Sequence, residues 1–529
     1  MKRRTLFPFV AAFVLAATMV LSGVSAVTWS SDIRLTTDVN GDWDPSAMQA
    51  NDGKIWVAWY SDRTGNHDIF YKIRSGSSWS GDVQLTDDPN DDVNPSILQA
   101  MDGKIWVVWD SDRLGSFNYE IYYKTSANSG ASWSADTRLT FNSSRDSYPS
   151  IMQSTDGKIW VFWSSWRNVT VEPPDPTYVS TANIFYKVSS DSGQTWSDDT
   201  LIVTDYKNNY RYDLYPSCMQ VANGSVWMMW TKQKEGQGGD IYYKIFNGTH
   251  WSSETTLVVV AGDDSRPSIM QTKNGRIWVF WHTDRNTKND IYYKVFDGLW
   301  SGDIKFTTAI EDDDWPSAMQ SSDLTIWVFW TSPRYPNLVY DIFYRTGMEL
   351  HDVAVRAVWS SASHEAFAFR GEVAYVEVEV ENQGEGMELV EVQCRANSTF
   401  LGSKVVTLNA GASYIATFGW NTTGARAGNY VLTGTVVPVL GEVDTADNTL
   451  SSGGFEIRIK GDICGWYGDV LMPVPDRRVN IDDFGMVVGH FGTASPTWNP
   501  VWGPACDVNE DGVIDLNDIM TVGVHYLET

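Results

Sequence analysis

The sequence predicts a mostly β protein with three parts: a six-bladed β-propeller, a β-sandwich and a small C-terminal module of loops and short helices. Its 529 residues exceed what one hydrophobic core normally holds, so several domains are expected. A strand-rich unit of roughly 50 residues recurs along the first two thirds of the chain. The composition then changes near residue 350 and again near residue 461.

The first 26 residues are typical of an export signal. Lys2, Arg3 and Arg4 precede an apolar run from Leu6 to Leu21, and Val24-Ser25-Ala26 offers small residues for cleavage. An uncleaved membrane anchor is the alternative, although the run is shorter than the roughly 20 residues that a spanning helix needs. No second apolar stretch of that length follows, so we expect a secreted or surface-associated protein without an integral membrane segment.

The net charge of the chain restricts its possible partners, and its few cysteines restrict the number of disulfides. The formal net charge of −27 makes nucleic acid and anionic membrane unlikely partners and favours cations. Four cysteines are too few for a disulfide scaffold. Cys464 and Cys506 flank the two halves of the C-terminal module and are candidates for one disulfide. Six Asn-X-Ser/Thr sequons permit glycosylation without demonstrating it.

The repeat unit reads PSAMQANDGKIWVAWYSDR, then DIFYK, then WSGDVQLT. Its copies begin at Pro45, Pro95, Pro149, Pro216, Pro267 and Pro316. Each copy contains four short strand-like runs, and an Asp-Gly or Asn-Gly turn suited to a hairpin joins the first two in most copies. Four antiparallel strands per unit match one propeller blade, which places the propeller at residues 27–347.

Two features predict that the repeat closes into a ring. The KIWVFW strand is apolar on both sides, as expected when neighbouring sheets cover both faces. The fourth-strand sequence is missing after the sixth DIFYR segment, but a copy stands at the beginning of the repeat as TWSSDIRLTTD, around Trp29. An N-terminal strand would therefore complete the last of six blades and remove the exposed edges.

The turn before the fourth strand carries a family resemblance. It reads SANSGASW at Ser126–Trp133 and SSDSGQTW at Ser189–Trp196. These segments resemble the Asp-box, S-X-D-X-G-X-X-W, of sialidase-like propellers. The resemblance covers residues 27–346 and implies the fold more than the activity, because Asp-boxes in that family are structural turns remote from the catalytic centre.

Candidate catalytic residues come from loops that share one face of the predicted propeller. The connections from the second to the third strand contain Ser-Asp-Arg or related sequences. They supply Asp62, Asp112 and Asp284 together with Arg63, Arg113, Arg285 and Arg334. Arginines could bind the carboxylate of an acidic sugar, and a carboxylate could act as acid or base. Tyr340 lies in the last blade, where the sialidase family keeps its tyrosine.

A structural interpretation of these residues competes with the catalytic one. Nearly identical Asp-Arg pairs recur in several blades, whereas catalysis needs unlike residues that converge. The pairs would then tie the loops of adjacent blades together. The sequence also lacks the early F-R-I-P motif of sialidases. Catalysis of sialidase type and non-catalytic glycan binding both stay open, so whether the protein is an enzyme is undecided.

Residues 350–458 predict an immunoglobulin-like β-sandwich, because short alternating strands are separated by Gly and Asn turns with no helical pattern. The segments VENQGEG, LNAGAS and DTADNT resemble CARDB-type adhesion domains. That resemblance implies a spacer or a weak binding module.

Residues 461–529 carry a calcium-binding signal. Calcium prefers six to eight oxygen ligands, which loop positions 1, 3, 5, 7, 9 and 12 supply around a glycine at position 6. The segment DVNEDGVIDLND provides them as Asp507, Asn509, Asp511, the Val513 carbonyl, Asp515 and Asp518. The aspartate at position 12 departs from the EF-hand and fits a loop followed by one helix. An ordinary solvated acidic turn is the alternative.

A weaker copy of this loop precedes it. The candidate ligands are Asp462, Asp476, the Arg478 carbonyl, Asn480 and Asp483, with Cys464 at position 3 and Arg477 in place of the turn glycine. The paired loops and helices resemble type I dockerins over nearly all of 461–529. A dockerin implies a cohesin-type protein partner, contacted through Ile481, Asp482, Leu516 and Asn517.

Taken together, the sequence favours a secreted, calcium-dependent docking protein that presents its propeller for carbohydrate or surface recognition. A glycoside hydrolase of sialidase type and a structural adhesion component are the alternatives.

Overall fold

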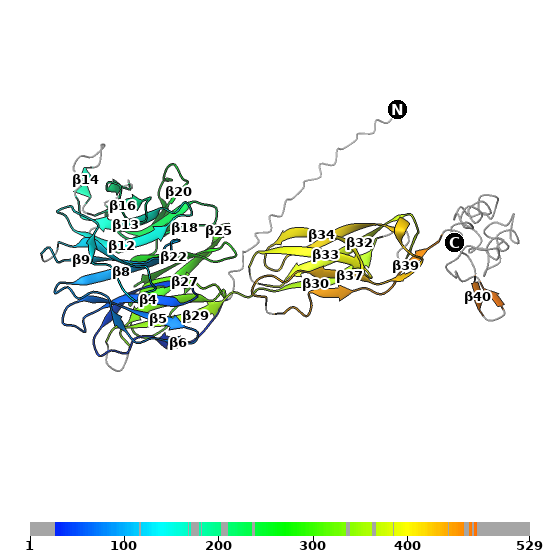
Figure 1. Ribbon diagram of the computed structural model, residues 1–529, viewed down its shortest axis with the longest axis horizontal. Coiled ribbons are helices and arrows are strands. Elements are labelled where there is room, and N and C mark those ends of the chain that lie inside the picture. The colour runs from blue at the N-terminus through cyan, green and yellow to red at the C-terminus, as the bar shows by residue number, and fades with distance from the viewer. Residues whose placement is uncertain are drawn as a thin grey trace, which may run out of the picture.

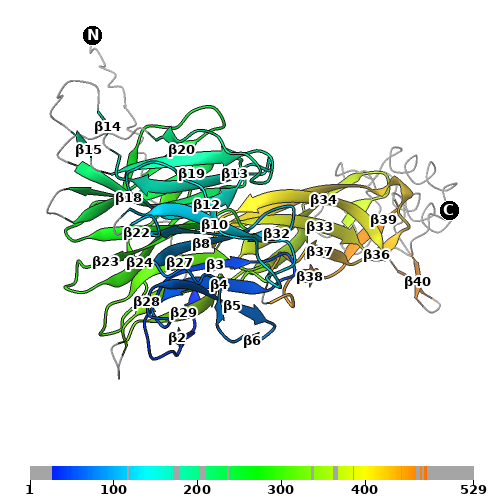
Figure 2. The ribbon, with the colours of Figure 1, turned by 60° about the vertical axis from the view of Figure 1, so that its left-hand side comes forward.

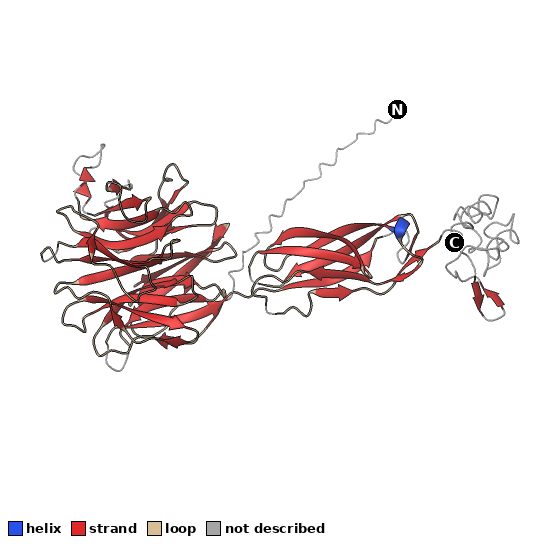
Figure 3. Ribbon diagram, in the orientation of Figure 1, coloured by secondary structure: helices blue, strands red, loops and turns tan. Residues whose placement is uncertain are grey.

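The computed structural model describes residues 27–459, apart from gaps at 116–117, 168, 171–178, 181, 203–209, 235–237, 335–338, 362–366, 385 and 443, and also residues 465–467 and 470–472. The predicted export signal and both predicted calcium loops lie outside the described residues. Within them the chain is almost entirely β, as predicted, and η2 (Thr422–Gly424) is the one helical segment (Figure 3). No described helix has the length and apolarity needed to cross a bilayer.

Six antiparallel sheets, one for each copy of the repeat, make up the N-terminal part of the molecule (Figure 1). Blade 1 holds β3 (Asp42–Gln49), β4 (Ile55–Ser61), β5 (Asp68–Ser75), β6 (Ser78–Trp79) and β7 (Val83–Gln84). Blade 2 holds β8 (Asp92–Gln99), β9 (Ile105–Ser111), β10 (Glu120–Ser126) and β11 (Thr137–Arg138). Blade 3 holds β12 (Asp146–Gln153), β13 (Ile159–Ser165), β16 (Asn183–Ser189) and β17 (Thr200–Leu201), with the hairpin β14 (Val169–Thr170) and β15 (Val179–Ser180) inserted.

The remaining three blades repeat this order. Blade 4 holds β18 (Tyr210–Gln220), β19 (Val226–Lys234), β20 (Gly239–Phe246) and β21 (Thr255–Val258). Blade 5 holds β22 (Asp264–Gln271), β23 (Ile277–Thr283), β24 (Asp290–Asp297), β25 (Leu299–Trp300) and β26 (Ile304–Lys305). Blade 6 holds β27 (Asp314–Gln320), β28 (Ile326–Ser332) and β29 (Asp341–Met348), completed by β1 (Thr28–Trp29) and β2 (Ile33–Arg34).

The apolar second strands form the cores between blades. In β9, β13, β23 and β28 every residue is buried, which explains why these strands do not alternate between apolar and polar residues. Their aromatic rings pack across the blade boundaries. Trp56 of blade 1, for example, contacts Trp133 of blade 2 edge-on at 6.5 Å between ring centroids.

The N-terminal strands close the ring. Thr28 and Trp29 of β1 pair with Met348 and Gly347 of β29, and β2 pairs with Tyr344 and Phe343 of the same strand. The Trp29 ring lies among Trp278, Phe280, Tyr293 and Phe306 of blade 5, with its centroid 4.8 Å from that of Phe306. A side chain at Gly347 would meet this ring, since a Cβ there would stand 2.5 Å from Trp29.

A chain of glutamine hydrogen bonds links the hairpin turns of all six blades. Each glutamine at the end of a first strand accepts a backbone N–H from the turn of the preceding blade. The last of these bonds, from the Ser322 N–H to the Gln49 side chain at 2.7 Å, joins blade 6 to blade 1. The others run from Asn51 to Gln99, Met101 to Gln153, Thr155 to Gln220, Ala222 to Gln271 and Lys273 to Gln320.

The two Asp-box turns are structural. The Asp191 carboxylate accepts hydrogen bonds from the backbone N–H and the hydroxyl of Thr195, and these bonds lower the pKa of Asp191 to about 2. Gly193 lets this turn pack on the preceding blade, because a Cβ there would lie 2.2 Å from Trp106. The turn fastens one blade to its neighbour and offers no free reactive group.

A β-sandwich follows the propeller (Figure 2). One sheet contains β30 (Val353–Ser360), β32 (Val373–Asn382) and β35 (Ser413–Asn421). A second contains β34 (Thr399–Leu408), β33 (Glu388–Ala396), β37 (Leu432–Val436) and β38 (Thr449–Ser451). A third contains β31 (Phe367–Phe369), β39 (Phe455–Arg458) and β36 (Gly428–Tyr430), and β40 (Gly465–Tyr467) pairs with β41 (Val470–Met472) further along the chain.

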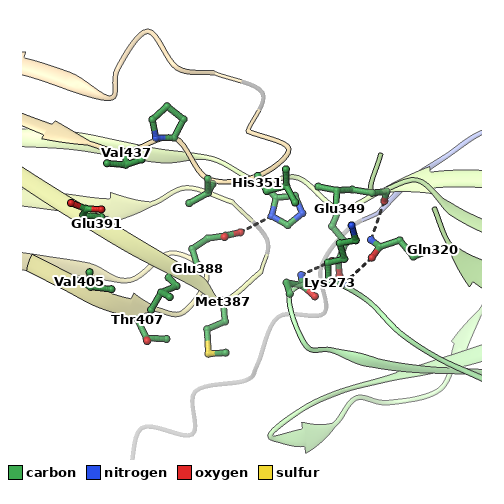
Figure 4. Close-up of a pocket in the computed structure, with 16 residues that line it drawn as sticks. Lys273, Gln320, Glu349, His351, Met387, Glu388, Glu391, Val405, Thr407 and Val437 are labelled. Carbon is green, nitrogen blue, oxygen red and sulfur yellow. Dashed lines mark hydrogen bonds and ion pairs between the residues drawn. The ribbon is translucent and has the colours of Figure 1, made fainter. Parts of the chain in front are cut away.

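Residues that differ from the repeat sequence form the contacts between the propeller and the sandwich. Arg276, where most other blades carry lysine, is buried and pairs with Glu349 of the connecting segment at 3.0 Å. His351 bonds to Glu388 of β33 at 2.6 Å, beside a cavity of about 610 Å³ lined by both domains (Figure 4). Leu324 holds a left-handed φ of 69° where all five of the other hairpin turns have glycine, and it packs near Gly441 of the sandwich.

Candidate functional site

Each predicted arginine lies in an ion-pair network within its own blade. Its guanidinium bonds to one aspartate at the start of the first strand or just before it, and to a second from the fourth-strand segment. The pairs are Arg63 with Asp42 and Asp82, Arg113 with Asp92 and Asp136, Arg285 with Asp264 and Asp303, Arg334 with Asp313 and Asp32, and also Arg167 with Asp146 and Asp199. We call these five groups the Arg–Asp knots.

The knot in blade 2 shows how fully such an arginine is occupied. Arg113 bonds to both oxygens of Asp92 at 2.9 and 3.0 Å, to Asp136 at 2.8 Å and to the Ser111 hydroxyl at 2.9 Å. Its guanidinium also lies 4.2 Å from the ring centroid of Tyr122. Burial raises the pKa of Asp92, and the charge of Arg113 opposes that rise. The knot therefore stabilises a buried carboxylate in the blade.

The aspartates that the sequence predicted as catalytic candidates bind the backbone of neighbouring loops. Asp62, Asp112 and Asp284 each accept a backbone N–H from the loop that enters their own blade, at 2.9, 3.0 and 2.7 Å. Tyr340 lies beside Trp43, with 5.8 Å between ring centroids, and burial raises its pKa. None of these residues, and none of the knot arginines, lines the cavity at the propeller axis described next.

A β-bulge in every blade directs one side chain towards the axis. The residue before each repeat proline has a left-handed φ between 53° and 61°, and the strand register shifts at that point. Bulges re-aim side chains, and such backbone in bulky residues is strained. The six residues, here named the axial cluster, are Asp44, Asn94, Tyr148, Tyr215, Arg266 and Trp315.

The axial cluster surrounds Arg266. The guanidinium carbon lies 4.2 Å from the ring centroid of Tyr215, 4.5 Å from that of Trp315 and 5.2 Å from that of Tyr148. Its Nη1 donates to Asp44 Oδ2 at 3.2 Å. Because these partners belong to four different blades, the guanidinium occupies the centre of the ring. The cluster, with the prolines and serines that follow it, lines a cavity of about 140 Å³.

Second-strand residues hold the axial cluster in place from behind. The backbone N–H groups of five members donate to a side chain of the preceding blade: Asp44 to Thr331, Tyr148 to Asp110, Tyr215 to Ser164, Arg266 to Thr231 and Trp315 to His282. These contacts fix the strained bulges, so the axial side chains are positioned before any ligand arrives.

Burial shifts the pKa values of several side chains that lie behind the axial cluster. It raises the pKa of Asp110 to about 7, against the hydrogen bonds from Asn94 at 2.9 and 3.1 Å. Burial and then the charge of Asp312 raise the pKa of Asp314 to about 7. Burial and then the charge of Arg266 lower the pKa of His282 to about 3, so its ring is neutral and its Nδ1 accepts the Trp315 N–H.

The Asp110→Asn variant should become more stable relative to the wild type as pH rises. Between pH 4 and pH 7 the folded protein keeps a proton on Asp110 that the unfolded chain has released, so this group's contribution to stability falls with increasing pH. The asparagine side chain does not titrate, so the variant lacks this pH-dependent contribution to stability. Melting temperatures from pH 4 to pH 8 would show a growing difference between variant and wild type, and Asp102→Asn on the surface is the control. A difference independent of pH would contradict the shift.

Sequence reasoning missed the axial cluster. The six positions precede the repeat prolines, and they hold five different residue types in otherwise similar copies. The variation of residue type at the position before each repeat proline is the sequence signal that marks them. The bulge that turns them inward has no such signal, because a residue before proline is ordinarily extended.

No protein-family model matches the sequence, and no curated protein matches it. Among solved structures, a protein of unknown function from Dyadobacter fermentans is 13% identical with a TM-score of 0.51, over 61% of this chain and 99% of its own. An α-L-arabinanase of Penicillium chrysogenum complexed with arabinobiose is 14% identical with a TM-score of 0.46, over 60% and 98%. The NanB sialidase of Streptococcus pneumoniae is 11% identical with a TM-score of 0.45, over 61% and 70%. At these identities the likeness concerns the fold alone.

Proposed function

We propose that the propeller binds an extracellular carbohydrate at its axial cluster. The observation that carries this proposal is that six structurally equivalent positions hold Asp44, Asn94, Tyr148, Tyr215, Arg266 and Trp315, while the frame around them repeats. A purely structural ring would be served by the same residue six times. Residues of different chemical types, held in a strained conformation around one cavity, are typical of a recognition site.

The chemistry of the cluster suits a sugar. Aromatic rings offer apolar faces to the C–H groups of a pyranose, and a guanidinium donates to hydroxyl oxygens. The cavity of about 140 Å³ is smaller than the roughly 300–1,000 Å³ that encloses a drug-sized ligand. The site would therefore take one terminal sugar residue, with the rest of the glycan lying outside.

Hydrolysis is the second candidate, and Asp44 is the observation in its favour. Burial raises the pKa of this carboxyl, as an acid catalyst requires, although the Arg266 charge opposes the rise. Glycoside hydrolysis usually needs two carboxyl groups, and Asp44 is the one carboxylate among the described residues that line the axial cavity. Binding without cleavage is therefore the better-supported function.

Export, calcium binding and docking complete the proposal on sequence grounds. The N-terminal signal supports secretion, and the loop at Asp507–Asp518 supports a calcium-dependent dockerin that holds a cohesin-type partner. In this arrangement the sandwich is a spacer, and the propeller is displayed away from the docking site.

The Arg266→Gln variant tests carbohydrate binding. On an array of neutral and acidic extracellular glycans, the full-length protein should bind at least one, and the variant should bind it at least about tenfold more weakly, since a charge-assisted donor at the centre of the site is lost. Asp191→Asn changes an Asp-box on the other face and should leave binding intact. Binding unaffected by Arg266→Gln, or no glycan bound at all, would reject the proposal. Release of sugar by the wild type would favour hydrolysis.

A further inference from the structure

The charges around the axial cavity indicate which sugars the site accepts. Arg266 is the one cationic residue among the described residues that line the cavity, and its only ion pair there is to Asp44. Both side chains are largely enclosed, with relative exposures of 16% and 22%. In such surroundings a charge pair interacts more strongly than in water.

Groups behind the cavity carry charges of both signs. Arg145 faces Asp110, and Asp312 and Asp313 lie near Asp314. Asp313 is already paired with Arg334, and His282 is neutral because its pKa is about 3. Burial raises the pKa of Tyr60 and of Tyr148, so both are uncharged phenols at neutral pH. Within the cavity Asp44 therefore balances the charge of Arg266, and a second anion at Arg266 would be opposed by Asp44.

We propose that Asp44 is a specificity-determining residue that neutralises Arg266, so that the axial site accepts uncharged sugars and rejects anionic ones. This inference rests on the proposed carbohydrate binding and identifies its substrate class. The rings of Tyr148, Tyr215 and Trp315 hold the guanidinium within reach of Asp44. The guanidinium would then donate its remaining N–H groups to hydroxyl oxygens of the ligand.

The Asp44→Asn variant removes the carboxylate with little disturbance of the bulge. Asparagine tolerates left-handed backbone, and Asn94 occupies the equivalent position of blade 2 with the same φ of 55°. The Asp44 N–H donates to Thr331 through the backbone, so the substitution keeps that bond. The variant should therefore fold, and its effect should report on charge.

Methyl glucoside and methyl glucuronide form a matched pair of probes, because they differ mainly in one carboxylate. The wild type should bind the glucoside better than the glucuronide. Asp44→Asn should bind both methyl glucuronide and acetate at least about tenfold more tightly than the wild type, as expected when a like charge is removed within a few ångströms. Titration of the full chain, followed by calorimetry and tryptophan fluorescence, measures these affinities.

Two further variants locate the effect. Asp87→Asn removes a charge from an exposed loop on the same face and should change neither affinity. Adding Arg266→Gln to Asp44→Asn should abolish the gain. If Asp44→Asn binds acetate and the glucuronide no better than the wild type, or if the wild type prefers the glucuronide, the inference is wrong. A wild type that binds no glycan would refute the proposed function, while the acetate measurement would still decide whether Asp44 screens Arg266.

Discussion

Replacement of Arg113 by methionine is expected to lower the free energy of unfolding by about 3–5 kcal/mol. The substitution keeps much of the side-chain volume over Tyr122 but leaves Asp92 buried without its cation. Asp136 would keep only its bond to Lys124, at 2.9 Å. The loss follows from an uncompensated buried carboxylate more than from the missing attraction. Urea denaturation of the full chain, followed by tryptophan fluorescence, would measure it.

Two controls make this expectation specific. Lys104→Met, in the same blade, breaks the exposed pair with Asp102 and should change stability by no more than about 0.5 kcal/mol. Combining Arg113→Met with Asp92→Asn should recover much of the loss, because the buried charge then disappears as well. A stable Arg113→Met protein that has lost only a catalytic activity would instead assign Arg113 to catalysis.

Replacement of Trp29 by alanine is expected to destabilise the propeller by about 3 kcal/mol or more. The ring packs against four aromatic residues of blade 5, and β1 pairs through its backbone with β29 of blade 6. Losing this anchor would release β1 and expose the edge of β29, which invites pairing with other chains. Thermal unfolding and light scattering would report the loss and the association.

Trp79 provides the matched comparison for Trp29. It occupies the equivalent position of blade 1 and packs in the same way, on Trp327, Phe329 and Tyr344 of blade 6. The strand β6 that carries it lies between β5 and β7 of its own blade. Trp79→Ala should therefore cost the packing energy without opening the ring. Equal losses and no association in the Trp29 variant would show that β1 adds packing only.

Much of the propeller was predictable because its determinants are local and repeated. The paired tryptophans, the Asp-Gly turns and the displaced copy around Trp29 indicated the strands, the blades and the pairing of the first strand with the last. The fourth strands proved shorter than expected. The segment at Trp79–Gln84 pairs as two short pieces, β6 and β7, on either side of the aspartate that joins the Arg–Asp knot.

The site was less predictable because it depends on contacts between residues that are distant in the sequence. The sequence pointed to Arg63, Arg113, Arg285 and Arg334. It also suggested that the recurring Asp-Arg pairs tie adjacent blades together, whereas each knot lies within one blade. It contained no indication that Asp82, Asp136, Asp303 and Asp32 complete the knots, since each lies about 20 residues or more from its arginine. The axial cluster needed the bulges, which only the folded strands reveal.

The bulge before each repeat proline has a consequence for how such a protein can change. Its conformation depends on backbone pairing and, in five of the six blades, on a hydrogen bond donated by the residue's own N–H, so the side chain at that position is not needed to build the sheet. Six independent substitutions can therefore accumulate there while the scaffold stays constant. The six axial residues can thus be exchanged without changing the blades that hold them. Randomising these six codons alone should yield proteins with new ligand preferences.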